Sequence, residues 1–508
     1  MILIYPPVAK PCEPSGGIAK LSGALNFHSV KHTVLDANLE GLLFLMEAAV
    51  NNRKDNFDTW TRRAMRNFNK NLCALKDRGT YQSIDRYRRA VMDVNRVLER
   101  SVDLDSIKLS LSNYQDQMLS PLRSGDLLKA AEMPEMNAFY PYFSRRLPSL
   151  VEQSQPAIVG FSLSYLSQAL TTFAMLGFLR REYPWITLAC GGGLVTSWLR
   201  SPCWNDPFTG LIDHLVDGPG ENAILALGGI NDGRNAHYTP DYGSLYNTDY
   251  MSPGPILPYS GSSGCFWNRC SFCPEKAEGN CYLPVGSQRA REDISSLVIR
   301  HRPALVHLLD NSISPSLMKA LIEGPPGARW YGFARIDKEL TDIDFCMALK
   351  RSGCVMLKLG IESGDQNVLD RMQKGIDLET ASLALKTLKK AGIASYVYLL
   401  FGTPEETVYG ARKTLDFTVR HSAEISFLNL ALFNMPAGCK AAESLETSSF
   451  YEGDLSLYCD FEHPDGWNRK KVRQFIEGEF KRQSEISAIL KNEPPFFTSN
   501  HAAFFSPE

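Results

Sequence analysis

The segment GCFWNRCSFCPE, residues 264–275, carries three cysteines within nine residues, at Cys265, Cys270 and Cys273. A run rich in glycine, serine and proline, SPGPILPYSGSSG at residues 252–264, leads into it. Closely spaced cysteines in one loop bring their sulfur atoms to a common ligand. The interposed Phe266, Trp267 and Phe272 would shield that ligand from water. The segment therefore predicts a shielded ligand site in a loop.

Three kinds of site use cysteines in this way. A disulfide framework leaves one thiol over and does not suit a reducing compartment. Structural zinc normally takes four ligands. Cys281 would be the fourth, but the chain has no second CxxC knuckle to pair with the first. An iron–sulfur cluster held by three cysteines employs all three thiols and leaves one iron open to chelate a substrate or cofactor.

The bulk composition is that of an ordinary globular enzyme. The chain has 508 residues, 44% of them hydrophobic and 22% charged, with a formal net charge of −2. This length suits about three domains, or two with a large insertion, and the charge gives no reason to expect nucleic acid as a partner. No apolar stretch of about 18 residues predicts a membrane span, and proline interrupts MILIYPPVAK too early for a signal peptide. The nine other cysteines are expected to be buried and reduced, which indicates a cytoplasmic protein.

The first half of the chain alternates strand and helix patterns. ILIY, a loop rich in proline and glycine, a helical pattern from about Ile18 and the run HTVLDAN predict a β-loop-α-β unit. The alternation resumes after about residue 155 with PAIVGFSLS, SQALTTFAMLGFLRREYP, WITLACGGG and DHLVDGPGENAILALGG. It predicts a parallel sheet with helices on both faces, which binds ligands at the carboxyl ends of its strands. The glycine runs 191–193 and 218–220 are either such ligand sites or simply tight turns.

Residues from about 40 to 150 interrupt this alternation with long amphipathic patterns, such as TWTRRAMRNFNKNLCALKDR and SIDRYRRAVMDVNRVLERSVD. These patterns predict a helical insertion. Between Arg53 and Arg100 basic residues outnumber acidic ones. A solvated helical face is the simpler interpretation, and a contact surface for an anionic substrate or partner is the alternative.

The βα alternation repeats after the cysteine segment, through ALVHLLD, WYGFARID, VMLKLGIESG, ASYVYLLFGTPEET and EISFLNLALF. Five or six βα units suit a barrel or partial barrel, whose chemistry lies at the carboxyl ends of the strands. Polar residues follow the strands there: Asp310, Asn311, Arg335, Asp337, Glu362, Ser363 and the loop Gly402–Thr407. His307 is expected to be a satisfied strand residue, and no His/Asp pair predicts a general base. The aromatic tail PPFFTSNHAAFF is expected to dock on the barrel.

A three-cysteine loop after the first strand of a (βα) barrel resembles the radical S-adenosylmethionine (SAM) superfamily. In that family three cysteines hold a 4Fe–4S cluster, the fourth iron binds the amino and carboxylate groups of SAM, and one electron cleaves SAM to a 5′-deoxyadenosyl radical. The resemblance implies that Cys265, Cys270 and Cys273 are the cluster ligands and that Phe272 is the aromatic residue before the last cysteine. The usual motif has three residues between the first two cysteines, whereas this chain has four, which resembles a subset of cobalamin-domain members.

Further segments resemble the same family in the same order: LLDNSIS, FARID, LKLGIESGDQNVLDRMQKG and AGIASYVYLLFGTPEET. The resemblance implies cofactor contacts at Glu362 and Ser363 near SAM, at Arg335 near its carboxylate, at Asp310 and Asn311 at the site mouth, and at Tyr398 and the loop from Gly402 by the adenosine. Trp330, Tyr331, Tyr396 and Tyr398 either line the pocket or pack in the core.

The front half resembles the cobalamin-binding domain found upstream of one radical SAM class. The similar segments are Pro6–Leu25, VLDAN, IVGFSLS, CGGG and VDGPGE, and the whole resemblance covers about residues 1–40 and 155–480. It implies cobalamin contacts at Ser162, Ser164, Gly191, Gly192, Gly193, Gly218, Gly220 and Glu221. The chain has no DxHxxG loop, whose histidine replaces the lower cobalt ligand in many cobalamin proteins; radical SAM members often lack it.

The resemblance implies an α/β architecture of three parts. These are a Rossmann-like cobalamin-binding-type domain at 1–250 with the insertion at about 40–150, a (β/α)6-type partial TIM barrel at 251–435, and a C-terminal extension at 436–508. The insertion and the aromatic tail are candidates for substrate recognition.

The implied function is that of a cobalamin-dependent enzyme whose radical abstracts hydrogen from an unactivated carbon for methyl transfer. Its cofactors would be a 4Fe–4S cluster, SAM and cobalamin. The alternatives are radical SAM chemistry without cobalamin, such as rearrangement or cyclisation, and a non-catalytic iron–sulfur protein. The expected partners are a small-molecule or peptide substrate and a reductant such as flavodoxin or ferredoxin.

Overall fold

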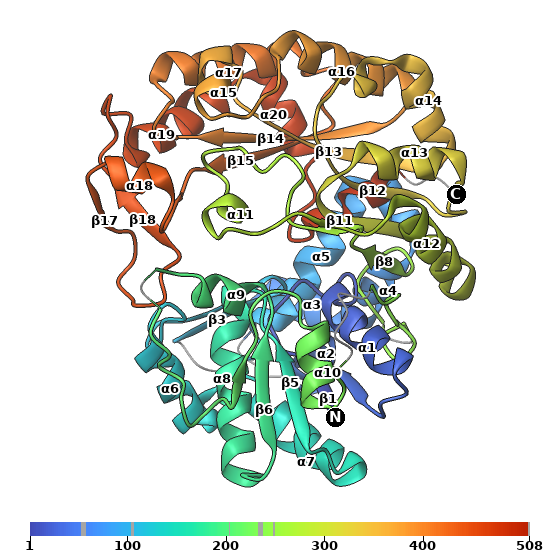
Figure 1. Cartoon of the computed structure of the whole chain (residues 1–508), viewed down its shortest axis with the longest axis vertical. Helices are drawn as coiled ribbons and strands as arrows, with labels where there is room; N and C mark the ends of the chain where they lie inside the picture. The colour runs from blue at the N-terminus through green and yellow to red at the C-terminus, as the bar shows by residue number, and fades with distance from the viewer. Residues whose placement is uncertain (52–56, 103–105, 203, 232–236, 247–248, 506–508) are drawn as a thin grey trace. The chain divides into compact units, whose positions relative to one another are not determined.

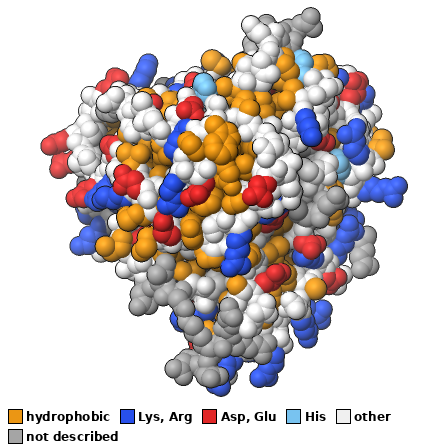
Figure 2. All heavy atoms as spheres, turned by 90° about the horizontal axis from the view of Figure 1, so that it is seen from below, with side chains coloured by type: hydrophobic (Ala, Val, Ile, Leu, Met, Phe, Trp, Pro, Cys, Tyr) orange, Lys and Arg blue, Asp and Glu red, His pale blue; other side chains and the backbone are white. Residues whose placement is uncertain are grey.

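The computed structural model describes residues 1–51, 57–102, 106–202, 204–231, 237–246 and 249–505. The chain divides into two compact units (Figure 1). Unit 1 comprises Met1–Pro255 with the short segments Tyr451–Leu457 and Pro495–Thr498, and unit 2 comprises the remainder. On the face shown in Figure 2, side chains of lysine and arginine are interspersed with those of aspartate and glutamate and with hydrophobic side chains. In the part of the chain that the structure describes, no helix has the length and apolar character needed to span a bilayer.

Unit 1 is built on a parallel five-stranded sheet in the order β2–β1–β5–β6–β7. Its strands are β1 (Ile2–Tyr5), β2 (Thr33–Asp36), β5 (Ile158–Ser162), β6 (Thr187–Gly191) and β7 (His214–Leu215). Its connecting helices are α1 (Gly16–Phe27), α8 (Leu166–Glu182), α9 (Gly193–Leu199) and α10 (Glu221–Leu227). The apolar runs of β1 and β5 are buried throughout, as expected of strands covered on both faces. The predicted β-loop-α-β start and the resumed alternation are confirmed.

Between β2 and β5 the chain is mainly helical, as predicted, but it contains one hairpin that was not expected. The helices are α2 (Ala37–Asn51), α3 (Thr59–Arg66), α4 (Phe68–Lys76), α5 (Ile84–Glu99), α6 (Ser124–Glu132) and α7 (Tyr140–Ser154), with 3₁₀ turns at Arg78–Gln82 and Pro134–Met136. The hairpin pairs β3 (Ile107–Ser110) with β4 (Asn113–Asp116). Ile107, Leu109 and Tyr114 are buried while Lys108 is exposed. The alternation that favours strands is therefore present, but over only four residues a strand.

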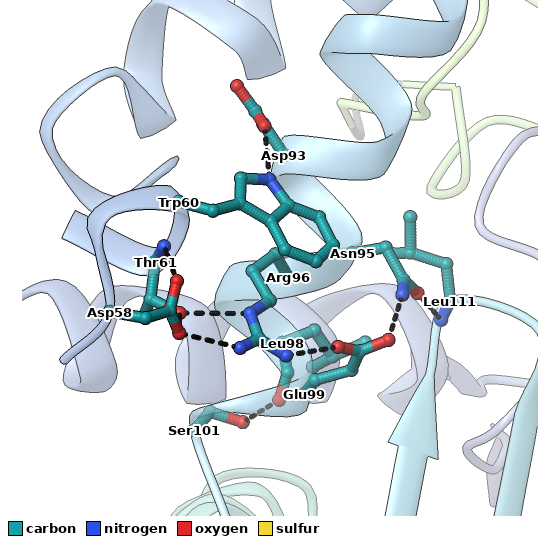
Figure 3. Close-up of polar contacts among 10 residues, drawn as sticks. All are labelled: Asp58, Trp60, Thr61, Asp93, Asn95, Arg96, Leu98, Glu99, Ser101 and Leu111. Carbon is teal, nitrogen blue, oxygen red and sulfur yellow. Dashed lines mark hydrogen bonds and ion pairs between the residues drawn. The ribbon is translucent and has the colours of Figure 1, made fainter. Parts of the chain in front are cut away.

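Arg96 on α5 ties this helical region together (Figure 3). Its guanidinium donates to Thr61 Oγ1 at 2.9 Å, Asp58 at 2.8 Å and Glu99 at 3.2 Å. The Trp60 ring lies 4.7 Å from Arg96 Cζ, and its Nε1 donates to Asp93 at 2.8 Å. The guanidinium of Arg96 is therefore engaged by side chains of unit 1. It does not contribute to the anion-binding surface that the sequence offered as an alternative.

Unit 2 is built on six parallel strands in the order β15–β14–β13–β12–β11–β8, which is the order of the chain. They are β8 (Ile256–Tyr259), β11 (Leu305–Ile313), β12 (Trp330–Ala334), β13 (Cys354–Glu362), β14 (Ala394–Phe401) and β15 (Phe427–Leu432). Its helices are α12 (Ser287–His301), α13 (Pro315–Glu323), α14 (Ile343–Arg351), α15 (Gln366–Arg371), α16 (Leu378–Ala391) and α17 (Val408–Arg420), with a 3₁₀ turn at Glu339–Thr341. The expected five or six βα units are confirmed. Strand β8, with the sequence ILPY, was not recognised because it lies within the run SPGPILPYSGSSG, which is rich in glycine, serine and proline.

The C-terminal extension adds a small antiparallel sheet in the order β16–β18–β17 and further helices. These elements are β16 (Met435–Pro436), α18 (Lys440–Ser444), β17 (Thr447–Ser449), β18 (Tyr458–Phe461), α19 (Arg469–Phe475), a π-helical turn at Ile476–Phe480, α20 (Ser484–Lys491) and a 3₁₀ helix at Thr498–Phe505. His501 stacks on Tyr396 of β14 with 4.7 Å between ring centroids, and Phe505 lies 5.5 Å from Phe427 of β15. The predicted docking of the aromatic tail on the strands is confirmed.

Candidate functional site

The three clustered cysteines lie in one loop at the carboxyl end of β8. The loop runs from β9 (Ser262–Ser263) to α11 (Pro274–Ala277), and the pairing of β9 with β10 (Leu283–Pro284) closes its base. Cys265, Cys270 and Cys273 are all half-buried. Gly264 begins the loop with φ +69°, where a Cβ would lie 2.4 Å from the carbonyl oxygen of Cys281. Only glycine fits this position.

The thiols of the loop lie within electrostatic range of one another and of two cations. Cys270 interacts with Cys265, Lys374 and Arg335, and Cys273 interacts with Cys270. Burial raises the pKa of Cys270 and raises that of Cys273 to about 11, while the two cations act to lower the pKa of Cys270. Two cations near Cys270 fit an anionic, thiolate-ligated cluster, because they offset negative charge, although Glu362 acts on the same thiol in the opposite direction.

Cys281 does not complete a zinc site with them. It is exposed, and its Sγ lies 3.9 Å from the carbonyl oxygen of Gly279. Among the described residues, no three Cys, His, Asp or Glu side chains are grouped to ligate a single metal ion. A cluster differs from one zinc ion because its thiolates bind separate iron atoms.

A turn that follows α15 packs on the cysteine loop. Ser271 N donates to Met372 O at 2.9 Å, and Lys374 Nζ lies 5.6 Å from the centre of the Phe272 ring. The same Nζ donates to Glu362 Oε1 at 2.9 Å, in a pair whose side chains are each 13% exposed. Glu362 adopts φ +68° at the end of β13, and such strained residues cluster at functional sites. Lys374 thus links the predicted residues Phe272 and Glu362, although the motifs did not single it out.

Asp310, Arg335 and Ser363 already have partners within unit 2. Asp310 accepts hydrogen bonds from Gly261 N at 3.0 Å and Ser262 Oγ at 2.6 Å. Arg335 donates to the carbonyl oxygens of Lys374 at 2.6 Å and Gly375 at 2.7 Å, and Ser363 Oγ lies 3.2 Å from Thr414 Oγ1. These bonds brace the loops at the carboxyl ends of the strands. Cofactor contacts at these three residues, and at the exposed Asn311, stay predictions.

The loop Gly402–Thr407 follows β14 and encloses a buried carboxyl group. Glu406 Oε2 accepts from Gly402 N at 2.6 Å and from Trp467 Nε1 at 2.9 Å, and burial raises the pKa of Glu406 to about 7. Three buried oxygen atoms of the loop have no hydrogen-bond partner among the described residues: Thr403 Oγ1, Glu405 Oε2 and Glu406 Oε1. Buried polar atoms are normally paired, so the loop fits a polar ligand that would complete these bonds.

The strands of unit 2 place a second polar group beneath this edge. Lys358 Nζ lies 3.2 Å from His307 Nε2, and the His307 ring stacks on Tyr331 at 4.4 Å. The half-buried Tyr398 lies 4.7 Å from the buried Tyr396. His307 is therefore a satisfied strand residue, as predicted. Lys358 was missed, although a lysine inside the otherwise apolar run VMLKLGI was a signal for it.

Three of the four aromatic residues that were candidates for the pocket wall belong to the core. Trp330 is buried and donates from Nε1 to Ser352 O at 3.2 Å, and Tyr331 is fully buried. Tyr396 is also buried, and its hydroxyl donates to Glu493 Oε1 at 3.3 Å. Of the four aromatic candidates, Tyr398 alone is half-buried and not buried, so it is the remaining candidate for a pocket wall.

In unit 1, the ends of β5 and β6 meet at the carboxyl edge of the sheet. Ser162 is buried there, and Leu163 N donates to Gly191 O at 2.7 Å. Gly192 has φ +112°, and a Cβ on it would lie 2.5 Å from Leu163 O. A Cβ on Gly193 would meet only Ser164 O, at 3.8 Å. The loops that follow the two strands therefore approach each other through bare backbone, which fits a ligand laid against this edge.

The predicted residues after β7 are bound within unit 1. Gly218 adopts φ +69° and its N donates to Thr196 Oγ1 at 3.0 Å. Gly220 precedes α10, and a Cβ on it would lie 3.1 Å from Leu21. Glu221 lies 3.8 Å from Lys20 Nζ in an ion pair between α10 and α1. The structure thus brings Ser162, Ser164 and the glycine triplet together. Gly218, Gly220 and Glu221 instead contact neighbouring residues of unit 1.

Comparisons with known sequences give distant relatives. No protein-family profile matches the chain. An uncharacterised methyltransferase of Pyrococcus horikoshii is 25% identical over 246 residues, which cover 44% of this chain and 53% of the relative. Bacteriochlorophyllide d C-12(1)-methyltransferase of Chlorobaculum tepidum is 24% identical over 270 residues, 50% of this chain and 57% of the relative. The chain therefore spans about half the length of these two relatives. The anaerobic magnesium-protoporphyrin IX monomethyl ester cyclase of Rubrivivax gelatinosus is 25% identical over 186 residues, 35% of this chain and 33% of the relative.

Two solved structures resemble the whole chain. The radical SAM methyltransferase TsrM of Kitasatospora setae, with tryptophan and a SAM analogue bound, gives a TM-score of 0.55 at 14% identity over 98% of this chain and 90% of its own. The cobalamin-dependent radical SAM enzyme OxsB, with aqua-cobalamin and SAM bound, gives 0.52 at 14% identity over 96% of this chain and 57% of its own. At these identities the likeness concerns the fold. The chain has the mixed α/β fold, with parallel sheets, of cobalamin-dependent radical SAM enzymes, so the resemblance that the motifs indicated is confirmed.

Proposed function

We propose that the chain is a cobalamin-dependent radical SAM enzyme, and most simply a methyltransferase. The observation that carries the proposal is the loop that holds Cys265, Cys270 and Cys273 at the carboxyl edge of a parallel sheet, with Cys270 within electrostatic range of Lys374 and Arg335. In this proposal unit 2 is the radical SAM domain and unit 1 is the cobalamin-binding domain. The named functions of the distant relatives support the class of reaction.

The proposed cofactors are a 4Fe–4S cluster, SAM and cobalamin. When bound, they supply an electron for the cleavage of SAM, a radical that abstracts hydrogen from carbon, and a methyl group for transfer. The protein's own contribution in unit 2 is to hold the three thiolates and to place Lys374 and Arg335 against their charge. Phe272, which precedes the last cysteine, packs against the buried cluster of Phe433, Met435 and Cys439.

The loop Gly402–Thr407 is the proposed SAM contact in unit 2. Its unpartnered oxygen atoms accept hydrogen bonds, and protonated Glu406 also donates one. In unit 1 the proposed cobalamin contacts are backbone groups around Gly191–Gly193 together with the hydroxyl of Ser162. The proposed partners are a small-molecule or peptide substrate and a reductant such as flavodoxin or ferredoxin.

The test is anaerobic reconstitution of the full chain with iron, sulfide and hydroxocobalamin, followed by gel filtration. Iron, cobalt and the visible spectrum are then measured, and 5′-deoxyadenosine is assayed after addition of SAM and dithionite. We expect about four iron atoms and one cobalt atom per chain. Iron without SAM cleavage would indicate a non-catalytic iron–sulfur protein, and the absence of iron would overturn the proposal.

The second candidate is radical SAM chemistry without cobalamin, such as cyclisation. One observation favours it, which is the match to a cyclase. The same experiment separates the two, because this candidate predicts cobalt at background with the iron–sulfur spectrum and SAM cleavage intact.

A further inference from the structure

The cysteine loop contains a tryptophan whose surroundings are unusual for a loop side chain. Four residues separate Cys265 from Cys270, and one of them, Asn268, has φ +42°. Asparagine tolerates this left-handed conformation better than most residues. The neighbouring Trp267 lies against the turn Met372–Gly375, which follows α15.

The indole of Trp267 is held from several sides. Its Nε1 donates to Gln373 O at 3.1 Å. Arg335 Cζ lies 3.7 Å from the ring centroid and Arg269 Cζ lies 4.9 Å from it, so the ring makes two cation–π contacts. Gly375 approaches so closely that a Cβ on it would lie 2.1 Å from Trp267 Cζ2. A substitution of Gly375 or a change of the indole would therefore disturb the same contact.

The turn itself presents its main chain to the cysteine loop. Four consecutive carbonyl oxygens accept hydrogen bonds: Met372 O from Ser271 N, Gln373 O from Trp267 Nε1, and Lys374 O and Gly375 O from Arg335. Gln373 and Gly375 have φ +54° and +67°. Two left-handed residues within four bend the chain so that successive carbonyls face a common side.

These contacts lie on both sides of the middle thiol. Trp267 precedes Cys270 by three residues and Ser271 follows it directly. Both are bonded to the turn Met372–Gly375, whereas the loop's own main-chain bond from Cys273 N to Cys270 O is long, at 3.4 Å. The turn therefore holds the segment around Cys270 from both sides, and Lys276 Nζ, which donates to Arg269 O at 2.7 Å, braces the same segment from within the loop.

We propose that Trp267, clamped between Arg335 and the turn Met372–Gly375, is a positioning residue for the cluster. The longer spacing between Cys265 and Cys270 provides the chain needed to reach this clamp. The inference rests on the proposed function, because it requires that the loop binds an iron–sulfur cluster. Residues that orient metal ligands in this way typically change metal affinity by about 10- to 100-fold when they are replaced.

The experiment compares Trp267→Ala, Trp267→Phe and the control Trp185→Ala with the wild-type chain. Trp185 is 68% exposed and lies in unit 1. Each protein is reconstituted with iron and sulfide, and the rate at which bathophenanthroline disulfonate removes iron is measured. The electron paramagnetic resonance spectrum of the dithionite-reduced cluster is recorded as well, because a general loss of stability would not change its g-values.

We expect Trp267→Ala to lose iron about 10- to 100-fold faster than the wild type, with altered g-values. Trp267→Phe should fall between them, since it keeps a ring against Arg335 but loses the bond to Gln373 O. Trp185→Ala should match the wild type. Wild-type rates and g-values in both Trp267 variants would overturn the inference; if circular dichroism shows Trp267→Ala unfolded, Trp267→Phe alone decides in the same way. A wild-type chain that takes up no cluster overturns the proposed function instead.

Discussion

Each unit places a carboxyl group at the carboxyl edge of its parallel sheet, and the two groups are bonded differently. In unit 1, Asp36 uses both oxygens: Oδ1 accepts from Leu39 N at 2.9 Å and Oδ2 from Tyr250 OH at 2.6 Å. In unit 2, Glu406 takes two donors on Oε2 and none from the described residues on Oε1. Burial raises the pKa of Asp36 to about 6 and that of Glu406 to about 7.

The difference indicates a structural role for the carboxyl group of Asp36 and a ligand-binding role for that of Glu406. The carboxyl group of Asp36 fastens β2 to Tyr250, and its hydrogen bonds are complete without a ligand. The carboxyl group of Glu406 leaves an oxygen that a ligand would satisfy. Unit 1 instead offers its proposed ligand bare backbone around Gly192, so the two units present different chemistry at equivalent edges.

The largest expected effect is that of removing a thiol from unit 2. Cys273→Ala should reduce iron after reconstitution to near background and abolish 5′-deoxyadenosine formation, because two thiols do not hold the cluster. Cobalt should be retained if unit 1 alone holds the corrin. Inductively coupled plasma analysis of both metals measures this, with Cys346→Ala as a buried-cysteine control outside the loop. Loss of cobalt together with iron would show that the units do not bind their cofactors independently.

The next effect concerns the backbone of unit 1. Gly192→Ala should lower the free energy of unfolding by roughly 3 kcal/mol, because its φ of +112° disfavours a side chain and the new Cβ would meet Leu163 O at 2.5 Å. Gly125→Ala, where a Cβ meets nothing within 4 Å, is the matched control and should be neutral or slightly stabilising. Urea unfolding followed by circular dichroism distinguishes the two. Equal stability of both variants would contradict the close approach of these loops.

Glu406→Gln tests the buried carboxyl group of unit 2 through the pH dependence of the free energy of unfolding. The pKa of Glu406 is raised from 4.5 to about 7 in the folded chain, so this group stabilises the fold fully below pH 4.5 and the stabilisation is lost as the pH rises to about 7. The gap corresponds to roughly 3 kcal/mol at most. Glutamine keeps an oxygen for Gly402 N and Trp467 Nε1 and does not titrate.

The Glu406→Gln variant should therefore show a flatter dependence of the urea midpoint on pH between 4.5 and 7, and higher stability than the wild type at pH 8. Asp36→Asn is the counterpart in unit 1, and it should flatten the pH dependence of the urea midpoint between pH 3.8 and about 6. An unchanged pH profile in Glu406→Gln would mean that this carboxyl group is not buried in the folded protein.

The smallest effect is expected in the helical region of unit 1. Arg96→Met keeps the packing on Trp60 but loses the bonds to Thr61, Asp58 and Glu99, and should cost about 1–2 kcal/mol. Arg89→Met changes an exposed arginine on the same helix and should stay within about 0.5 kcal/mol. Amide hydrogen exchange of α3 and α5 reports the difference locally. Equal exchange rates in Arg96→Met and Arg89→Met would show that the hydrogen bonds of Arg96 do not stabilise this region.

The sequence predicted most of the framework and the loop that brings the three cysteines together, because these depend on local patterns; that they ligate a cluster stays a prediction. The apolar runs of β5 and β13 and the spacing of Cys265, Cys270 and Cys273 are visible without a structure. Strand β8 was not recognised, because proline and glycine surround its four residues. The β3–β4 hairpin was missed since its alternation is short.

The contacts within the candidate site were less predictable, because they join residues far apart in the chain. Lys374 meets Glu362 and Phe272 only through the bend after α15, and the pairing of Lys358 with His307 depends on the lateral order of the strands. The left-handed conformation of Glu362 could not be predicted from the sequence, because glutamate does not favour it. The sequence identified which loops meet at the edge, but not which side chains are already bonded there.

The turn Met372–Gly375 holds the cysteine loop through carbonyl oxygens, and this has a consequence for tracing distant homologues. A carbonyl is the same in every residue, so the exposed Gln373 can be exchanged for residues that tolerate its φ of +54°, glycine and asparagine above all, while the bond from Trp267 persists. Gly375 cannot, because the indole occupies the space of its side chain. We therefore expect homologues that keep the indole to keep Gly375 as well, and the residue that imposes this glycine, Trp267, lies more than a hundred positions earlier, between the first two cysteines.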